Sequence, residues 1–470
     1  MDVKANNFIA TAQIALSNPQ LQATLAVCTH NGLQGRVAGV FEFGRQHGEA
    51  LRRQAAEAKR RALRNLPDLL EQAEARMQAN GMHVLWAADA AEARQHVIDL
   101  VRQHGARRIT KSKSTLTEEI GLNPALEQIG VEVLETDLGA YIVQLAGEAP
   151  SHIVGPALHM SKDDIRDLFI RKLQMPFTDR AEEMTRFVRE HLRRAFLQAD
   201  LGICGGNFIV AETGSLCLST NEGNGRMVTT LPRVLVAIVG IEKVVETLAD
   251  FATLSQMLAR SNSGQSMTVY TQMIHGARGA GEEDGPEEVY IILVDNGRSR
   301  IYATDYAEVL SCIRCGACLS ACPVYASTGG HAYGWIYSGP IGAVLTPLLV
   351  GLDNAAPLPF ASSLCGRCKE VCPVDIDLPR MLLDLRRDLV QQGHSSALWS
   401  LGLRLWAGVS RSQRLFGWGR RLVRWGMRLI PQRLPGPWRA WTRHRALPPP
   451  PDTSFHALWR AREAAKRHEQ

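Results

Sequence analysis

The chain of 470 residues lacks the features that mark export or membrane insertion. Its first 20 residues show no basic start followed by an apolar run, so we expect no secretory signal. A clean stretch of about 20 apolar residues is also missing. The nearest candidate, residues 324–352, is interrupted by glycines and by Pro340 and Pro347. These absences predict a cytoplasmic protein without a membrane span.

Nucleotide-binding loops are missing as well. The sequence contains neither a GxGxxG loop nor a Walker loop, so nothing indicates a nucleotide, and no flavin motif is evident. The composition is otherwise that of an ordinary globular protein, with 45% hydrophobic and 21% charged residues. The length exceeds that of one usual core and predicts two or three domains.

What the chain does have is a cluster of cysteines. Seven of the ten lie between Cys312 and Cys372. The first four, followed by a proline, have the spacing C-x2-C-x2-C-x3-C-P, which is typical of a [4Fe–4S] cluster. Three closely spaced thiolates on a tight loop bind one cube, and the fourth points toward a second cluster. We therefore expect thiols kept reduced in the cytosol and not disulfides.

The second motif is one thiol short. Aligned on its closing Cys-Pro, it has Ser362 where the first motif has a cysteine. Crossed ligation predicts one complete set and one set of three. The first cluster takes Cys312, Cys315, Cys318 and Cys372, and the second takes Cys322, Cys365 and Cys368. The second cluster is then either [3Fe–4S] or [4Fe–4S] with an open or non-cysteine ligand, for which Ser362 is the positional candidate.

Two alternatives apply to this region. Zinc also binds Cys-x2-Cys pairs, but it explains four ligands and not seven with a Cys-Pro closing each motif. Arg314, Arg367 and Lys369 lie inside the motifs. They either offset the negative charge of the clusters or are solvated surface side chains.

Upstream, helix-like and strand-like segments alternate from about residue 66 to residue 300, which predicts an α/β domain with a largely parallel sheet. Before it, residues 45–66 are rich in Ala, Arg and Leu and are expected to be helical. The strand-like segments are His83–Ala87, Arg108–Thr110, Val131–Glu135, Tyr141–Leu145, Phe208–Ala211, Ser215–Ser219, Val234–Gly240 and Val289–Val294. The helix-like segments are Leu69–Ala79, Ala90–His104, Asp163–Leu173 and Ala181–Gln198.

Four polar or basic residues of the predicted α/β domain are candidates for binding an anion such as a carboxylate or phosphate. Lys111 and Lys113 stand beside serines, and Asn224 and Arg226 belong to a polar, Gly-rich loop at residues 220–226, after a strand. The alternative is a turn with solvated charges. Several other residues receive weaker assignments: Glu119, Glu212 and Glu222 as acids or bases, His152 and His159 as structural histidines, and Cys28, Cys204 and Cys217 as thiols outside the clusters.

The C-terminal part is basic and rich in tryptophan. Residues 395–470 hold 15 of the Lys and Arg residues and 3 of the Asp and Glu residues, and seven of nine tryptophans lie between Trp399 and Trp459. Residues 398–430 suit amphipathic helices that lie on an anionic membrane or dock on a partner subunit. No nucleic-acid reader motif accompanies them. The alternative is an extension packed on its own core.

Several stretches resemble one family, lactate utilization protein B. They are Lys111–Asn123, Glu135–Gly139, Gln144–Glu148, Pro150–Ile153, Ala211–Ser215, Thr220–Arg226, Tyr333–Trp335, Gly339–Pro347 and both cysteine motifs. The resemblance covers most of residues 30–390. It implies an α/β domain similar to sugar-phosphate isomerases and CoA transferases, followed by an α-helical ferredoxin-type domain.

The resemblance also implies a function. Members look like the iron–sulfur electron carrier of a three-protein system that oxidises L-lactate to pyruvate. We therefore expect an N-terminal helical segment (1–65), an α/β lactate-utilization domain (66–300), a two-cluster domain (301–395) and a basic helical extension (396–470). The expected partners are the other subunits with their redox donor and acceptor. The alternatives are an α/β enzyme that itself acts on a carboxylic acid or thioester, and a scaffold with inert clusters.

Overall fold

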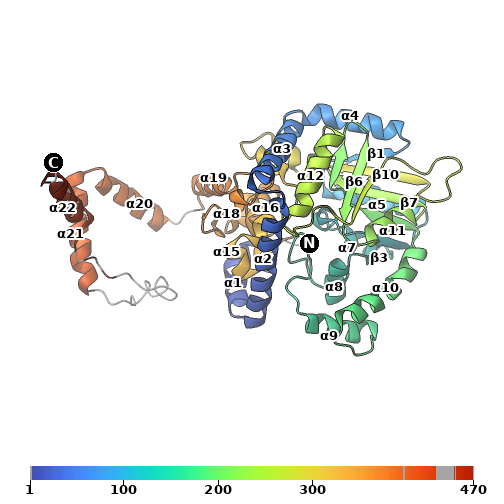
Figure 1. Cartoon of the computed structure of the whole chain (residues 1–470), viewed down its shortest axis with the longest axis horizontal. Coiled ribbons are helices and arrows are strands. Elements are labelled where there is room, and N and C mark those ends of the chain that lie inside the picture. The colour runs from blue at the N-terminus through green and yellow to red at the C-terminus, as the bar shows by residue number, and fades with distance from the viewer. Residues whose placement is uncertain (1–2, 395–396, 430–448, 450, 452, 469–470) are drawn as a thin grey trace. The chain divides into compact units, whose positions relative to one another are not determined.

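The computed structural model describes residues 3–394, 397–429, 449, 451 and 453–468. Its contacts divide the chain into two compact units, Met1–Leu389 and Val390–Gln470 (Figure 1). Within the described residues, no helix has the length and apolar character needed to cross a membrane. The first unit holds all the described strands and both cysteine motifs.

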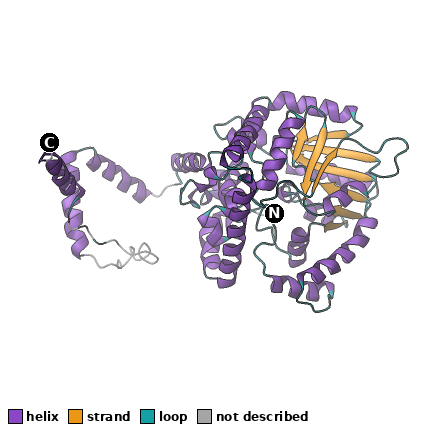
Figure 2. Ribbon diagram, viewed as in Figure 1, coloured by secondary structure: helices purple, strands orange, loops and turns teal. Residues whose placement is uncertain are grey.

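The first unit contains a six-stranded sheet that is parallel throughout, as the alternating pattern predicted (Figure 2). Its central strands are buried on both faces and consist of nearly continuous apolar residues, which is usual for parallel sheets. In spatial order the strands are β1 (His83–Ala87), β10 (Glu288–Val294), β7 (Val234–Gly240), β4 (Leu201–Cys204), β2 (Arg108–Lys111) and β3 (Glu132–Glu135).

Alternate side chains of these strands enter two different cores. Val236 and Ile292 belong to a core that includes residues of helices α5 (Ala90–Gln103) and α7 (Leu122–Gln128). Their neighbours Leu235 and Ile291 belong to a larger core shared with the N-terminal helices and the cysteine region. Because side chains alternate along a strand, one sheet supports both cores.

A second sheet was not predicted as a separate unit. It consists of β8 (Val244–Val245), β5 (Phe208–Val210), β6 (Ser215–Thr220) and β9 (Tyr270–Ile274) in that order. The β5–β6 and β6–β9 pairs are antiparallel. β9 has only partly buried and exposed side chains, so its sequence gives little apolar signal for a strand.

One predicted strand is wrong. Residues 141–145 belong to helix α8 (Leu138–Ala146) and not to a strand. The side chain of Asp137 accepts a hydrogen bond from Ala140 N at 3.0 Å, and Gly147 ends the helix with a φ of 70°. These two caps outweigh the strand preference of the Tyr-Ile-Val run. The remaining helices of this region are α6 (Thr115–Glu119), α9 (Lys162–Leu173), α10 (Ala181–Leu197), α11 (Asn224–Thr230), η2 (Ile241–Lys243), α12 (Leu248–Arg260) and α13 (Arg298–Tyr302).

The N-terminal residues are helical, as η1 (Ala5–Asn7), α1 (Phe8–Leu16), α2 (Pro19–Val40), α3 (Arg45–Arg64) and α4 (Leu66–Ala79). They connect the α/β region to the cysteine region. Arg36 Nε donates to Val371 O at 3.1 Å and Arg52 Nη2 to Cys372 O at 2.9 Å. Lys59 Nζ donates to Glu242 O at 2.7 Å. Buried bonds to backbone carbonyls fix these helices in position.

The described residues of the cysteine region form helices joined by loops, with no strand among them. Its elements are η3 (Ala307–Ser311), α14 (Ala317–Ser320), α15 (Pro323–Thr328), η4 (His331–Tyr333), α16 (Gly339–Val350), α17 (Leu352–Ala355), η5 (Leu358–Phe360), α18 (Arg367–Glu370) and α19 (Leu378–Gln391). The second unit contains α20 (Ala397–Ser410), α21 (Gln413–Leu429) and α22 (Phe455–His468), so its predicted helices are present. The described side chains of α20 are all exposed or partly exposed.

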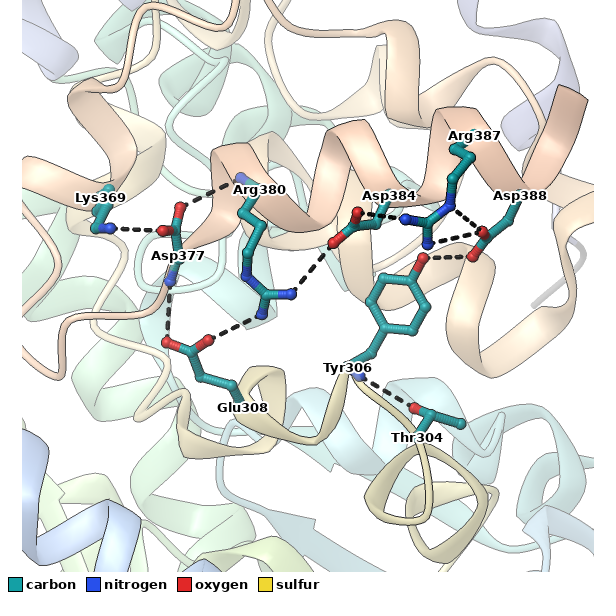
Figure 3. A network of polar contacts seen from close by, with 9 residues as sticks. All are labelled: Thr304, Tyr306, Glu308, Lys369, Asp377, Arg380, Asp384, Arg387 and Asp388. Carbon is teal, nitrogen blue, oxygen red and sulfur yellow. Dashed lines mark hydrogen bonds and ion pairs between the residues drawn. The ribbon is translucent and has the colours of Figure 1, made fainter.

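A polar network ties η3, just before the first cysteine motif, to α19, after the second (Figure 3). Asp377 donates its N–H to Glu308 at 3.1 Å and accepts a bond from Lys369 at 2.5 Å. Tyr306 donates its hydroxyl to Asp388 at 2.5 Å. An exposed pair such as Lys369–Asp377 adds little stability singly, but the network as a whole joins the segment before the first motif to the helix after the second.

Candidate functional site

The two cysteine motifs share one backbone path. Arg314 and Leu364 occupy equivalent positions and have φ values of 62° and 54°. Gly316 and Gly366 follow with φ values of 82° and 83° and begin the short helices α14 and α18. Two left-handed residues within three positions turn the loop tightly. The same frame places Ser362 where the first motif has its first cysteine.

Four thiols from both motifs surround one small cavity. Cys312, Cys315 and Cys318 come from the first motif, and Cys372 comes from the end of the second. The rest of the wall is largely apolar and includes Ile313, Ile341, Val374, Ile376 and Leu378. These four are the thiols that crossed ligation assigns to the first cluster.

The electrostatics of this group suit a cluster. Burial, with a smaller contribution from the charges of neighbouring thiols, raises the pKa of Cys315 to about 12 and that of Cys372 to about 11, although backbone hydrogen bonds oppose the rise. Four thiolates in such a place repel one another unless a strongly cationic centre holds them. Soft sulfur donors in a tight, dry cavity fit an iron–sulfur cluster.

The remaining motif thiols form a second group. Burial raises the pKa of Cys368 to about 12, and the charges of Cys322 and Cys365 add to this rise. Cys365 is exposed. The short helices α14 and α18, which carry Cys318 and Cys368, contact each other, so the two groups are neighbours. Cys322, Cys365 and Cys368 are the three thiols that crossed ligation assigns to the second cluster.

The other cysteines lie elsewhere in the fold. Cys204 is in β4 and Cys217 is in β6, and burial raises the pKa of each to about 12. Cys28 lies on α2, where its thiol contacts Leu158 O at 3.9 Å. These positions agree with the prediction that the three are ordinary thiols outside the clusters.

A buried ion network joins the first cysteine motif to the parallel sheet. Arg298 binds both carboxylate oxygens of Glu119 at 2.8 and 2.9 Å, and its Nε donates to Glu242 at 2.7 Å. Glu242 also faces Arg314 at 3.6 Å. Tyr337 donates to Glu119 at 2.6 Å and lies beneath Arg314, 4.7 Å from ring centroid to guanidinium carbon. Paired in this way, the charges are tolerated in the interior.

This network decides the role of several predicted residues. Although burial opposes ionisation of Glu119, Arg298 and two further donors hold the pKa of this carboxyl below its usual value. It is therefore a structural anion and not a free base. Glu212 caps α12 through Leu248 N at 2.9 Å. Of the motif cations, Arg314 is largely buried, with 11% of its side chain exposed, whereas Arg367 and Lys369 are exposed and ion-paired.

A cavity of about 320 Å³ opens at the carboxyl edge of the parallel sheet and reaches Cys315. Four of its wall residues are basic and three are acidic, in addition to serine, threonine and asparagine side chains. The charged residues are Lys113, Lys243, Arg298, Arg314, Asp137, Glu222 and Glu242. The carboxyl edge of a parallel sheet is the usual place for ligands.

Only two of the four predicted anion-binding residues belong to the wall of this cavity. Lys113 and Asn224 line it, whereas Lys111 and Arg226 do not. Lys111 is fully buried, and its ammonium contacts Thr117, Glu118 and Glu135 at 2.9, 3.2 and 2.5 Å. Since these contacts use all its protons, the expectation that Lys111 binds an anion is wrong.

Sequence reasoning missed Lys243. Within the described residues its ammonium forms no hydrogen bond or ion pair, while burial lowers its pKa to about 8. The sequence signal that could have identified Lys243 is its position three residues after Gly240, which ends the buried strand β7.

A second cavity, of about 900 Å³, lies where residues 146–172 meet residues 331–335. Glu148, His159 and His331 belong to its wall. His152 is separate from it: this ring is buried, its Nδ1 accepts from Val154 N and Gly155 N at 3.1 Å each, and burial lowers its pKa to about 3. His152 is the structural histidine that was predicted.

Three families match along the chain. The LUD domain matches residues 70–294, the 4Fe-4S dicluster domain residues 308–376, and the C-terminal family of lactate utilisation protein B residues 387–464. A Deinococcus radiodurans protein of the DUF162 family, known from a crystal structure, aligns with a TM-score of 0.29 and 16% identity over 49% of this chain and 98% of that one.

Proteins named lactate utilization protein B are similar over nearly the whole length. The one from Bacillus velezensis is 44% identical over 92% of both chains, and that from Geobacillus thermodenitrificans is 42% identical over 98% of both. The one from Bacillus subtilis is 43% identical over 92% of this chain and 91% of its own. Identity of this extent, together with the three domain matches, places the chain in the lactate utilization protein B family.

Proposed function

We propose that this protein is the iron–sulfur electron-transfer subunit of a system that oxidises L-lactate to pyruvate. The observation that carries the proposal is the cavity in which Cys372 of the second motif joins Cys312, Cys315 and Cys318 of the first. Its near relatives are named for lactate utilization. Iron–sulfur clusters supply one-electron steps, and two of them can relay singly the two electrons that lactate oxidation releases.

We assign one cluster to each of the two thiol groups. Cys312, Cys315, Cys318 and Cys372 would hold a [4Fe–4S] cluster, and Cys322, Cys365 and Cys368 would hold a [4Fe–4S] or [3Fe–4S] cluster. In the first case Ser362 has the position of a fourth ligand. Zinc explains the paired loops less well, because seven thiols in two adjoining groups exceed what one tetrahedral ion takes.

The chain's own residues prepare the first site. Its apolar wall excludes water, which strengthens every charge interaction there. Arg314, held by Glu242 and Tyr337, sets a fixed positive charge beside Cys312 and Cys315. A fixed cation favours the more negative, reduced state of a neighbouring centre.

Partners and location follow from the same proposal. The other subunits of the system supply and accept electrons in the cytoplasm. The C-terminal unit presents exposed apolar side chains among arginines, with Trp399 67%, Trp418 71% and Trp425 66% exposed. Such helices suit docking on a partner subunit or peripheral contact with an anionic membrane.

The test is iron and sulfide analysis of anaerobically purified protein, combined with electron paramagnetic resonance (EPR). Frozen samples with L-lactate should show reduced clusters only when the partner proteins are present. Clusters that stay oxidised at physiological potentials in the complete system would instead favour a structural scaffold. Colourless protein with zinc and without acid-labile sulfide would refute the proposal.

One observation favours a second candidate function, an α/β enzyme acting directly on a carboxylic acid. The cavity at the sheet edge has one more basic than acidic side chain, which favours a monoanion, and it reaches Cys315. The parallel sheet is also compatible with the expected similarity to sugar-phosphate isomerases and CoA transferases. Turnover of lactate with a dye acceptor by the purified protein alone, lost in Lys243→Gln, would support this function over the carrier.

A further inference from the structure

A site separate from both thiol groups gathers three metal-binding side chains. Glu148 and His159 lie in the segment between α8 and α9, and His331, which begins η4, comes from a distant part of the chain. One ligand atom from each lies within 4.8 Å of the others. The two imidazole rings meet edge to face, with 4.4 Å between their centroids.

The hydrogen bonds of His331 leave one ring nitrogen for a ligand role. Its Nε2 lies 2.7 Å from the carbonyl oxygen of Ala149. A carbonyl only accepts hydrogen bonds, so Nε2 carries the proton. In the neutral ring Nδ1 is then an unprotonated lone pair. A histidine held by its other nitrogen to a backbone carbonyl is the usual arrangement of a metal ligand.

His159 has a matching support. Its Nδ1 lies 2.8 Å from the Ser151 hydroxyl, which in turn lies 2.9 Å from the carbonyl oxygen of Pro156. When Ser151 donates to this carbonyl, Nδ1–H donates to Ser151 and Nε2 carries the lone pair. That Nε2 lies 2.7 Å from Glu148 Oε2. Two acceptors at this distance need either a proton between them or a metal ion that binds both from one side.

We propose that Glu148, His159 and His331 form a binding site for one divalent transition-metal ion of the zinc class. Two neutral imidazoles and one carboxylate form a ligand set that zinc accepts, with a fourth position left for an exchangeable ligand. The cavity of about 900 Å³ on this side has room for that ligand. His159 then differs from the structural role that the sequence suggested.

The surroundings agree with a site that binds an anion through the metal. Arg171, Lys172 and Lys4 line the same cavity, as do Asp164 and Asp167. Asp164 is already engaged in the capping box of α9 with Ser161. Asp167 is paired with Arg166 at 3.1 Å, so the three basic side chains are left to attract a metal-bound anion.

The test uses the full chain with its clusters loaded, because empty thiol groups also bind zinc. After dialysis against a chelator, calorimetry with Zn²⁺ should show one site per chain, with the iron content unchanged. His159→Gln and His331→Gln should each weaken this binding at least tenfold. Glu148→Gln, at a side chain that is 46% exposed, should do the same without loss of folding.

His96→Gln is the matched control. His96 also faces a carboxylate, that of Glu92 at 4.0 Å, and bonds to a carbonyl oxygen, that of Trp86 at 2.9 Å, but it belongs to no three-ligand group in the described chain. It should bind zinc as the parent does. Absence of a zinc site in cluster-loaded protein, or equal affinity in all four variants, would show that a proton alone joins His159 to Glu148. Iron and sulfide content, measured on the same samples, tests the electron-transfer proposal separately.

Discussion

Arg314 of the first cysteine motif lies 3.6 Å from Glu242, which follows the central strand β7. Through Glu242 the motif is connected to Arg298 and Glu119, whose side chains are 2% and 0% exposed. The α/β region and the cysteine region therefore share one buried set of charges, and damage to it is expected to affect both.

Glu119→Gln should destabilise the protein strongly. The substitution leaves Arg298 with one carboxylate in place of two, and removing one partner of a buried pair costs about 3–5 kcal/mol. Denaturant unfolding followed by circular dichroism measures the loss. Glu370→Gln is the control, because its pair with Arg367 is 65% and 48% exposed and should change stability by less than about 1 kcal/mol. Equal effects would contradict a stabilising role for the buried network.

Gly316→Ala should be worse than Gly366→Ala. Both glycines have φ near 82°, so each substitution carries a backbone cost of about 1–2 kcal/mol. At Gly316 the added Cβ would also meet Val154 Cγ2 at 3.0 Å and His152 Cε1 at 3.1 Å, whereas nothing described lies within 4 Å at Gly366. Thermal unfolding and iron retention compare the two variants. A larger loss for Gly366→Ala would refute this explanation.

Arg314→Gln should lower the reduction potential of the first cluster. Removing this largely buried cation makes the added electron less favourable, by about 50–100 mV at separations of a few ångströms. A redox titration followed by EPR measures this shift. Lys369→Gln should change the potential much less, because Lys369 is 46% exposed and paired with Asp377. An unchanged potential in Arg314→Gln would mean that its charge is fully neutralised by Glu242.

The C-terminal unit should bind anionic vesicles in a salt-dependent way if it contacts membranes. Co-sedimentation of the full chain with phosphatidylserine vesicles tests this contact, and Arg420→Glu with Arg421→Glu should weaken it severalfold. Both arginines lie on α21 beside exposed tryptophans. Binding that is absent at low salt would leave a partner subunit as the surface that these helices dock on.

The sequence was most informative where a local rule governs the structure. Buried strands such as Val234–Gly240 could be predicted from their continuous apolar residues. The cysteine spacing likewise predicted two neighbouring thiol groups. It was least informative where distant segments meet. The partners of Lys111, the buried pairing of Glu119 and the approach of His331 to His159 depend on tertiary contacts over as many as 179 residues, and no local pattern encodes them.

The central claim is that the two motifs exchange their last cysteine. EPR and iron analysis of Cys372→Ala, purified anaerobically beside the parent chain, test it most directly. The parent should hold about seven or eight iron ions. Cys372→Ala should lose the cluster that Cys312→Ala also removes and keep the other. If Cys372→Ala instead removes the same cluster as Cys365→Ala and Cys368→Ala, each motif binds its own cluster and crossed ligation is wrong.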